Sequence, residues 1–373
     1  MPELKYLSNF LLLSLCLILN GTLLSAGIVY GRLQAPAAST VEGTDGRLKS
    51  LASTVEGTDG RLQSPPALVR VSFPDVQASL PKEISGLEKH QCGSDVEFLA
   101  SVICEGRRSG TKGYGEAFGY VCRRMSAIDG LSAPEALSFP LSDGVIGHNL
   151  AAFLPASEKT GSRNYIVVMA SLDGMGTING SMYPGADSNA SGVAAMLGIA
   201  GRLAAAPVRP RNVVFVALDG HRHNCSGSQA LWDAVSSGKL TDPMTGFPVR
   251  ASQISLVVNL DIIGSSLSPV VKYNKEYLIA LGGAYYSRSL ESANKAFGLH
   301  LTYDYYGSRD FTRLFYNRTG DHRIFLEHGL RCVVFTSGIT MLTNKPEDRP
   351  SALACPLLEK RIDFISSWLL SLH

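Results

Sequence analysis

The sequence carries almost no net charge, because 34 basic residues stand against 32 acidic ones in a chain of 373. Without a basic excess, the chain lacks the electrostatic attraction that drives binding to nucleic acid. Its seven cysteines include no Cys-x-x-Cys pair and no Cys/His cluster at zinc-finger spacing. The apolar run near the N-terminus, Phe10–Leu19, has ten residues, whereas a membrane-spanning helix needs ~20. These absences argue against a nucleic-acid-binding protein and against an ordinary transmembrane segment.

Apolar material is plentiful, since 45% of the residues are hydrophobic and 18% are charged. This composition excludes a wholly disordered chain and provides enough side chains for a sizeable core. The length suits one large α/β domain or two ordinary ones.

Residues 1–30 are predicted to be a signal peptide or an N-terminal anchor. Lys5 supplies a positive start, the run Phe10–Leu19 follows, and Leu24-Ser25-Ala26 resembles a weak cleavage site. An uncleaved anchor over residues 7–29 is the alternative. We therefore expect an exported protein, which is periplasmic, secreted or held to a membrane only by this segment. Export also permits disulfides, although the sequence assigns no pairing and Cys332 lies in an apolar strand pattern.

Residues 31–66 are predicted to be a flexible linker. Ser39–Leu48 recurs unchanged at Ser53–Leu62, and two such short polar copies cannot bury a face. The folded domain is then expected over residues 67–373.

Continuous apolar strands alternate with helices in this domain. Such strands are typical of a mainly parallel sheet covered on both faces. We predict an α/β fold, a three-layer sandwich with a mixed, mainly parallel central sheet, whose site lies at the carboxyl ends of the strands. Helices are expected over 95–103, 114–125, 189–203, 226–236, 287–297, 322–328 and 357–372, and strands over 148–155, 165–170, 212–218, 256–263, 277–281 and 332–336.

Polar segments follow the predicted strands in a characteristic order. They read ASLDGMG (170–176), YPGADSNASG (183–192), LDGHRHNCSGS (218–228), NLDIIGSS (259–266), GDHRIFLEHG (320–329) and NKPEDRPS (344–351). This series resembles the di-zinc aminopeptidases of metallopeptidase family twenty-eight, and Glu105–Met125 and Gly147–Ala156 resemble the same family's upstream segments. The resemblance covers roughly residues 95–370 and implies that fold. Nicastrin is a non-catalytic relative.

The resemblance also implies ligand positions, and most of them are replaced. The family's first His ligand falls on Ser171, its bridging Asp on Ser188, its liganding Glu on Arg222 and its last His on Asn344. Asp261 is the one ligand that is kept. A guanidinium is never deprotonated in proteins, so Arg222 places a fixed positive charge where a cation is expected.

Two further family positions surround that site. The general-base Glu falls on His221, whereas the Asp that orients a ligand is kept as Asp173. We therefore predict a pseudo-peptidase that binds a peptide or protein ligand in the old cleft, without zinc and with no confident catalytic residue. The alternative is an active metallo-aminopeptidase or other hydrolase with zinc in a site rebuilt around Asp261, His221, His223 and Asp173, to which Asp219 would add a carboxylate.

Other interpretations remain open. Ser171 or Ser188 would be a nucleophile with His221 as base and Asp261 or Asp173 orienting it, although no Gly-x-Ser-x-Gly turn surrounds either serine. A subunit of a membrane complex, in the manner of nicastrin, would require an uncleaved N-terminal anchor.

Two more segments are expected to have structural rather than functional roles. Asp321-His322 is expected to be a helix cap followed by a hydrogen-bonded His. Tyr303, Tyr305 and Tyr306 are expected to be half-buried loop aromatics, with binding of a peptide or sugar as the alternative.

Overall fold

The computed structural model describes residues 68–69, 91–157 and 162–372. These residues all fall in one compact unit, Ser64–His373. The predicted signal or anchor segment, Cys16 and the repeat-containing linker lie outside the described residues, so those expectations stay predictions.

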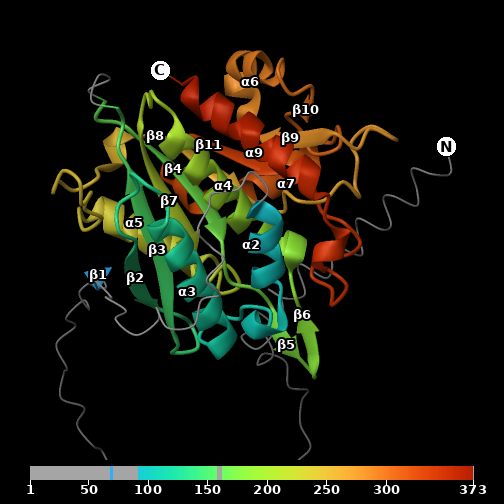
Figure 1. The fold of residues 1–373 in the computed structure, drawn as a ribbon, viewed down its shortest axis with the longest axis horizontal. Coiled ribbons are helices and arrows are strands. Elements are labelled where there is room, and N and C mark those ends of the chain that lie inside the picture. Colours follow the sequence, from blue (N-terminus) through green and yellow to red (C-terminus); the bar gives the residue numbers. More distant parts are fainter. Residues whose placement is uncertain (1–67, 70–90, 158–161, 373) are drawn as a thin grey trace, which may run out of the picture. The chain divides into compact units, whose positions relative to one another are not determined.

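The main sheet of the described residues has nine strands in the order β1-β2-β3-β7-β4-β8-β11-β9-β10 (Figure 1). At its centre, β4 runs parallel to both β7 and β8, and β11 runs parallel to β8. The pairs β2–β3, β3–β7 and β9–β11 are antiparallel. The strands are β1 (Leu68–Val69), β2 (Glu135–Pro140), β3 (Ile146–Leu154), β4 (Tyr165–Ser171), β7 (Asn212–Leu218), β8 (Ile254–Leu260), β9 (Tyr277–Leu281), β10 (His300–Thr302) and β11 (Cys332–Thr336).

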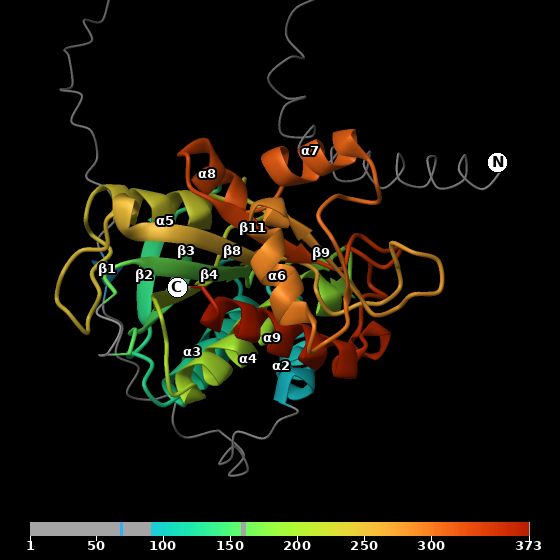
Figure 2. The same ribbon diagram turned by 90° about the horizontal axis from the view of Figure 1, so that it is seen from above.

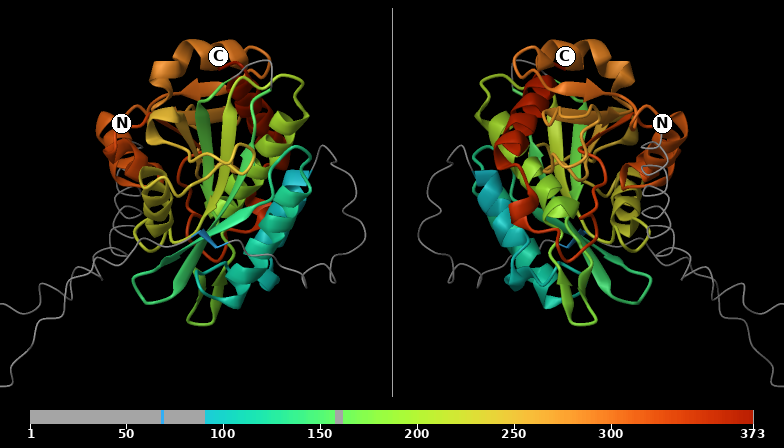
Figure 3. Two further views of the ribbon diagram at one scale, coloured as in Figure 1. Left: turned by 90° about the vertical axis from the view of Figure 1, so that its left-hand side faces the viewer. Right: turned by 90° about the vertical axis from the view of Figure 1, so that its right-hand side faces the viewer.

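Helices cover both faces of this sheet (Figure 2). One layer holds α2 (Gln91–Leu99), α3 (Lys112–Ser126), α4 (Ser191–Ala205) and α9 (Cys355–Leu370). The opposite layer holds α5 (Ser226–Ser236) and α8 (His322–Glu327), with α7 (Arg309–Arg318) beside α8. Helix α6 (Ser287–Asn294) packs against α9. Side views show the strands between the two layers, which is the predicted three-layer sandwich (Figure 3).

The central strands are apolar throughout because both of their faces are buried. In β4, Ile166 and Val168 pack into the core beneath α2, α3, α4 and α9, whereas Val167 and Met169 pack into the core beneath α5 and α8. All seven residues of β4 are buried. This alternation fixes the register of the strand and leaves its carboxyl end to carry polar residues.

Several predicted boundaries differ from the structure by one to four residues, and three of the differences have a clear local cause. The first helix ends at Leu99 rather than residue 103. There the Arg107 guanidinium donates a hydrogen bond to the Leu99 carbonyl, and the chain turns. The strand expected to reach residue 263 ends at Leu260, where the chain bends into the loop of Ile262. Helix α4 begins at Ser191 rather than residue 189, because Ser188 and Asn189 have non-helical angles.

The described cysteines form no disulfides. Cys92, Cys104, Cys122, Cys225, Cys332 and Cys355 are free thiols in the described part of the chain, and Cys332 is 2% exposed in the core, as expected. Of the helices that the structure describes, none has the length and apolar character to cross a bilayer.

Candidate functional site

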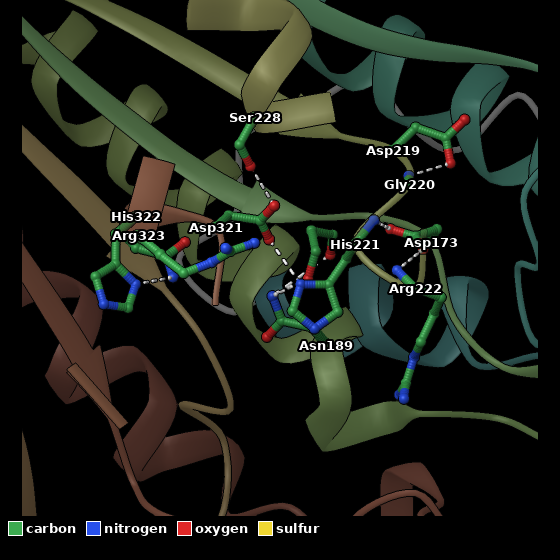
Figure 4. A network of polar contacts seen from close by, with 12 residues as sticks. Asp173, Asn189, Asp219, Gly220, His221, Arg222, Ser228, Asp321, His322 and Arg323 are labelled. Atoms are coloured by element: carbon green, nitrogen blue, oxygen red, sulfur yellow. Dashed lines mark hydrogen bonds and ion pairs between the residues drawn. The ribbon is translucent and has the colours of Figure 1, made fainter. Parts of the chain in front are cut away.

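Polar loops meet at the carboxyl ends of β4, β7 and β8, which are neighbours in the sheet. Asp173 follows β4, the segment Asp219–Arg222 follows β7, and Asp261 follows β8. Figure 4 shows several of these side chains together with Asp321, which comes from the segment before α8. The sequence therefore predicted this meeting point correctly.

Asp173 holds the loop that follows β7. Its two carboxylate oxygens accept the backbone N–H groups of His221 at 3.0 Å and Arg222 at 3.1 Å. Burial, together with the nearby Asp219 carboxylate, raises the pKa of Asp173 to about 6. Asp173 thus orients two backbone amides and fixes the backbone positions of His221 and Arg222.

His221 is paired with Asp321. Its Nδ1 lies 2.9 Å from Asp321 Oδ2, and Asp321 also accepts the hydroxyl of Ser228 (Figure 4). Burial opposes a charge on the ring, but the Asp321 carboxylate outweighs it, so the pKa of His221 stands well above its usual value. The pKa of Asp321 is lowered, because His221 and Ser228 outweigh the effect of burial. The two side chains form a hydrogen-bonded pair in which the carboxylate favours the protonated form of the ring.

Asp321 occupies the N-cap position of α8, as expected, but its side chain does not cap the helix. Its carboxylate makes no capping hydrogen bond to α8, because it is committed to His221, which is 100 residues away in sequence. The second part of that expectation is confirmed, since His322 Nε2 lies 2.7 Å from the Tyr316 carbonyl.

The two serines at ligand positions have other partners. Ser171 Oγ accepts from the Asn189 amide at 3.3 Å, and Ser188 Oγ donates to Asp348 Oδ2 at 3.1 Å. Asp348 also accepts the Ser188 backbone N–H at 3.0 Å. Within the described residues, no hydrogen bond joins either serine to His221, so the geometry gives the serine-nucleophile interpretation no support.

Arg222 and Asn344, the two positions at which the resemblance implies metal ligands, are joined directly. The guanidinium Nη2 of Arg222 donates to Asn344 Oδ1. Asp261 lies near Arg222 and His221, and both lower its pKa, but burial dominates and raises it overall. In the described part of the chain, no side-chain hydrogen bond to the Asp261 carboxylate occurs.

A strained residue follows Asp261. Ile262 has φ 56°, a left-handed conformation that is rare for a β-branched side chain. Its N–H donates to Asn189 Oδ1 at 2.9 Å, and its carbonyl accepts the Ser337 N–H at 2.7 Å. Such strain persists only where the surroundings hold it, and here it turns the chain out of β8 directly after Asp261.

The other members of the rebuilt metal set do not converge. His223 Nδ1 lies 3.2 Å from Ser142 Oγ, and its Nε2 lies 4.0 Å from Asp143. Asp219 accepts the hydroxyl of Ser109 at 2.6 Å and the backbone N–H of His148 at 2.9 Å. These two side chains therefore bind partners on neighbouring segments, a loop for His223 and both a loop and strand β3 for Asp219.

The three tyrosines hold loops together. Tyr305 is 2% exposed and accepts the Ile339 N–H at 2.7 Å, whereas Tyr306 donates to the Ser268 carbonyl at 2.8 Å. Tyr303 donates to Glu291 at 2.8 Å. These contacts agree with loop aromatics, although Tyr305 is more deeply buried than expected.

Sequence reasoning missed Cys225. His221, Cys225 and Asp321 each offer one potential ligand atom, and these atoms lie within 4.8 Å of one another. Cys225 stands at the start of α5, four residues after His221. The signal in the sequence was the four-residue spacing of His221 and Cys225, because a single turn of chain brings such residues close together.

The donor set does not fit a pair of zinc ions. Zinc takes thiolate, imidazole and carboxylate ligands, and two ions need a carboxylate that bridges them. At the position where the resemblance implies the bridging Asp, the chain has Ser188, whose hydroxyl donates to Asp348. Where the resemblance implies a liganding Glu, the chain has the guanidinium of Arg222, which donates to Asn344. Asp261 alone cannot supply the missing donors.

The profile of Peptidase family M28 matches residues 149–368. No curated protein matches the sequence.

Solved structures share the fold at low sequence identity. A glutaminyl cyclase of Fimbriiglobus ruber has a TM-score of 0.60 and 15% identity over 83% of this chain and 100% of that one. The LapA aminopeptidase of Legionella pneumophila has a TM-score of 0.58 and 11% identity over 76% of this chain and 71% of that one. A zinc aminopeptidase from Bacillus subtilis has a TM-score of 0.55 and 14% identity over 76% of this chain and 95% of that one.

Proposed function

The chain belongs to Peptidase family M28, and from this premise we propose that it is an exported pseudo-peptidase, which binds a peptide in the family's cleft without hydrolysing it. The observation that carries the proposal is the hydrogen bond between Arg222 and Asn344. These two residues place a cation and a neutral amide at two positions where the resemblance implies metal ligands. The export segment supports the location only through its sequence pattern.

Electrostatics opposes a metal pair beside Arg222. Two like unit charges ~4 Å apart repel by about 4 kcal/mol at an effective dielectric constant of 20. A divalent ion at that distance from the guanidinium would meet roughly twice this repulsion. General acid–base catalysis raises a reaction rate ~10²–10⁴-fold. The residue at the position of the family's base is His221, and its ring is already hydrogen-bonded to Asp321.

We expect the purified full chain to carry no pair of zinc ions and to release no nitroaniline from aminoacyl-nitroanilides above the rate of an Asp261→Ala variant. Metal content is measured by mass spectrometry, and turnover is measured with and without a chelator. Two zinc ions per chain together with chelator-sensitive turnover would overturn the proposal and favour an active hydrolase.

The site offers one carboxylate that suits a peptide amino terminus. Asp261 is half-buried, and its carboxylate is not committed to another described side chain by a hydrogen bond. A charge-assisted hydrogen bond from an ammonium group complements such an oxygen, and its single charge meets only half of the repulsion from Arg222 that a divalent ion would meet at the same distance. Peptides with a free amino terminus are therefore the ligand class that we propose.

We expect Asp261→Asn to weaken binding of free-amino tetrapeptides by about 10-fold, the equivalent of ~1.4 kcal/mol for one lost charge interaction. Binding is measured by calorimetry on a tetrapeptide set, in free and N-acetylated forms. The acetylated peptides should bind equally to both proteins. Asp143→Asn is the matched control, because Asp143 is exposed on a different loop. Equal affinity of the parent for free and acetylated peptides would contradict this role of Asp261.

A further inference from the structure

We propose that His221, Cys225 and Asp321 form a binding site for a single zinc-class metal ion, displaced from the positions that the family uses for its ion pair. Their ligand atoms lie within 4.8 Å of one another. Imidazole, thiolate and carboxylate are the three ligand types that zinc prefers. Neither Cys225 nor Asp321 matches a ligand position of the family, so this site is independent of the proposed function.

The local fold brings the first two ligands together. Cys225 has φ 60° at the start of α5, and its N–H donates to the His221 carbonyl at 3.2 Å. This turn places both side chains on one short loop. Gly227 allows α5 to begin there, because a Cβ on it would lie 2.1 Å from the Asp219 carbonyl oxygen.

The third ligand arrives from the segment before α8. Helices α5 and α8 pack together over the same face of the sheet. Asp321 precedes α8, and its Oδ2 already lies 2.9 Å from His221 Nδ1. The hydroxyl of Ser228, on α5, donates to the other oxygen of Asp321. Outer partners of this kind orient ligating carboxylates in metal sites.

The spacing suits coordination after a small contraction. With metal–ligand bonds of 2.0–2.3 Å, donors in a tetrahedral site stand roughly 3.3–3.8 Å apart. The widest separation here therefore needs to shrink by about 1 Å. Cys225 and Asp321 are 6% and 2% exposed, whereas the His221 side chain is 29% exposed. The buried donors anchor the ion, and solvent can reach the fourth position.

Binding is an exchange of protons for the ion. The thiol proton of Cys225 and the proton on the coordinating ring nitrogen of His221 pass to solvent, because both ligands must be deprotonated. Asp321 coordinates as the carboxylate. No oxidant or further reactant is needed.

Cobalt titration of the full chain, stripped with a chelator, tests this site. We expect one Co²⁺ per chain, with the ultraviolet absorption of a cobalt–thiolate bond. Cys225→Ser should abolish that absorption and weaken binding by at least ~100-fold, since changes to outer partners alone cost 10–100-fold. Ser228→Ala should weaken binding by about 10-fold and keep the absorption.

Cys122→Ser is the matched control, because Cys122 is half-buried on α3, on the opposite face of the sheet. It should change neither the absorption nor the affinity. Circular dichroism of each variant verifies folding. X-ray absorption of the parent with cobalt, which needs no variant, should find one sulfur donor beside nitrogen and oxygen.

The outcomes separate the two proposals. No bound cobalt, or a cobalt shell without sulfur, would overturn the single-ion site and leave the pseudo-peptidase proposal standing. An unchanged cobalt–thiolate band in folded Cys225→Ser would also overturn it. Two ions per chain with peptidase turnover, and no sulfur in the metal shell, would overturn both.

Discussion

Arg107→Met is expected to lower the free energy of unfolding by about 3–5 kcal/mol. Arg107 is fully buried, and its guanidinium donates to four backbone carbonyls, those of Leu99, Leu172, Pro184 and Gly185. Leaving a buried acceptor without its donor costs ≈ 1–3 kcal/mol. Methionine keeps the apolar stem but satisfies no carbonyl. The relief of the buried charge offsets only part of this loss.

The same change should loosen the site, because the four carbonyls belong to the segments that position it. Leu172 directly precedes Asp173, and Gly185 directly precedes the turn that carries Ser188. Arg107→Lys is expected to be nearly as destabilising, since one compact ammonium cannot span carbonyls that a planar guanidinium reaches together.

Denaturant unfolding followed by the fluorescence of Trp232 and Trp368 measures these changes. Arg108→Met is the matched control, because Arg108 is the exposed neighbour, and its substitution should shift stability by less than about 0.5 kcal/mol. A loss of under 1 kcal/mol in Arg107→Met would show that the four carbonyls find other donors.

The buried centre of the fold is the part that the sequence predicts best. Strands β7, β9 and β11 and helix α5 begin and end at the predicted residues, because they are apolar runs or helical patterns bounded by polar turns. Strand β2 escaped prediction, since it lies towards the edge of the sheet and carries a mixed pattern. Helix α7 also escaped, because it has no buried residue, although its cap Ser308 is a recognisable start signal.

The sequence predicts where the site lies, but it does not predict which side chains form hydrogen-bonded pairs there. Strand order at the sheet centre brings Asp173, His221 and Asp261 to one edge, and any mainly parallel sheet does the same. Which carboxylate pairs with His221 depends on how α8 packs against α5, across 100 residues of sequence. Local rules therefore assigned Asp321 to a helix cap, and they gave no reason to place Cys225 beside it.

Asp187→Asn is expected to stabilise the protein above pH 7 by up to about 4 kcal/mol relative to its effect near pH 3. Asp187 is 4% exposed, and burial together with the neighbouring Asp348 raises its pKa to about 7 from an ordinary 3.8. One pKa unit corresponds to 1.36 kcal/mol. Its Oδ1 accepts the Gly264 N–H at 2.8 Å and the Ser191 hydroxyl at 3.1 Å, whereas its buried Oδ2 has no hydrogen-bond partner.

The sign follows from proton binding. Between pH ~4 and ~7 the unfolded chain has already lost the Asp187 proton while the native state still holds it, so stability falls as pH rises through this window. Above pH 7 the native state carries a buried anion with one oxygen unpartnered, and asparagine removes that charge while its amide oxygen still accepts from Gly264. Unfolding free energies of parent and variant, measured from pH 3 to 8, should diverge steadily across the window. A constant difference over that range would mean that Asp187 is ionised at its ordinary pKa in the folded protein.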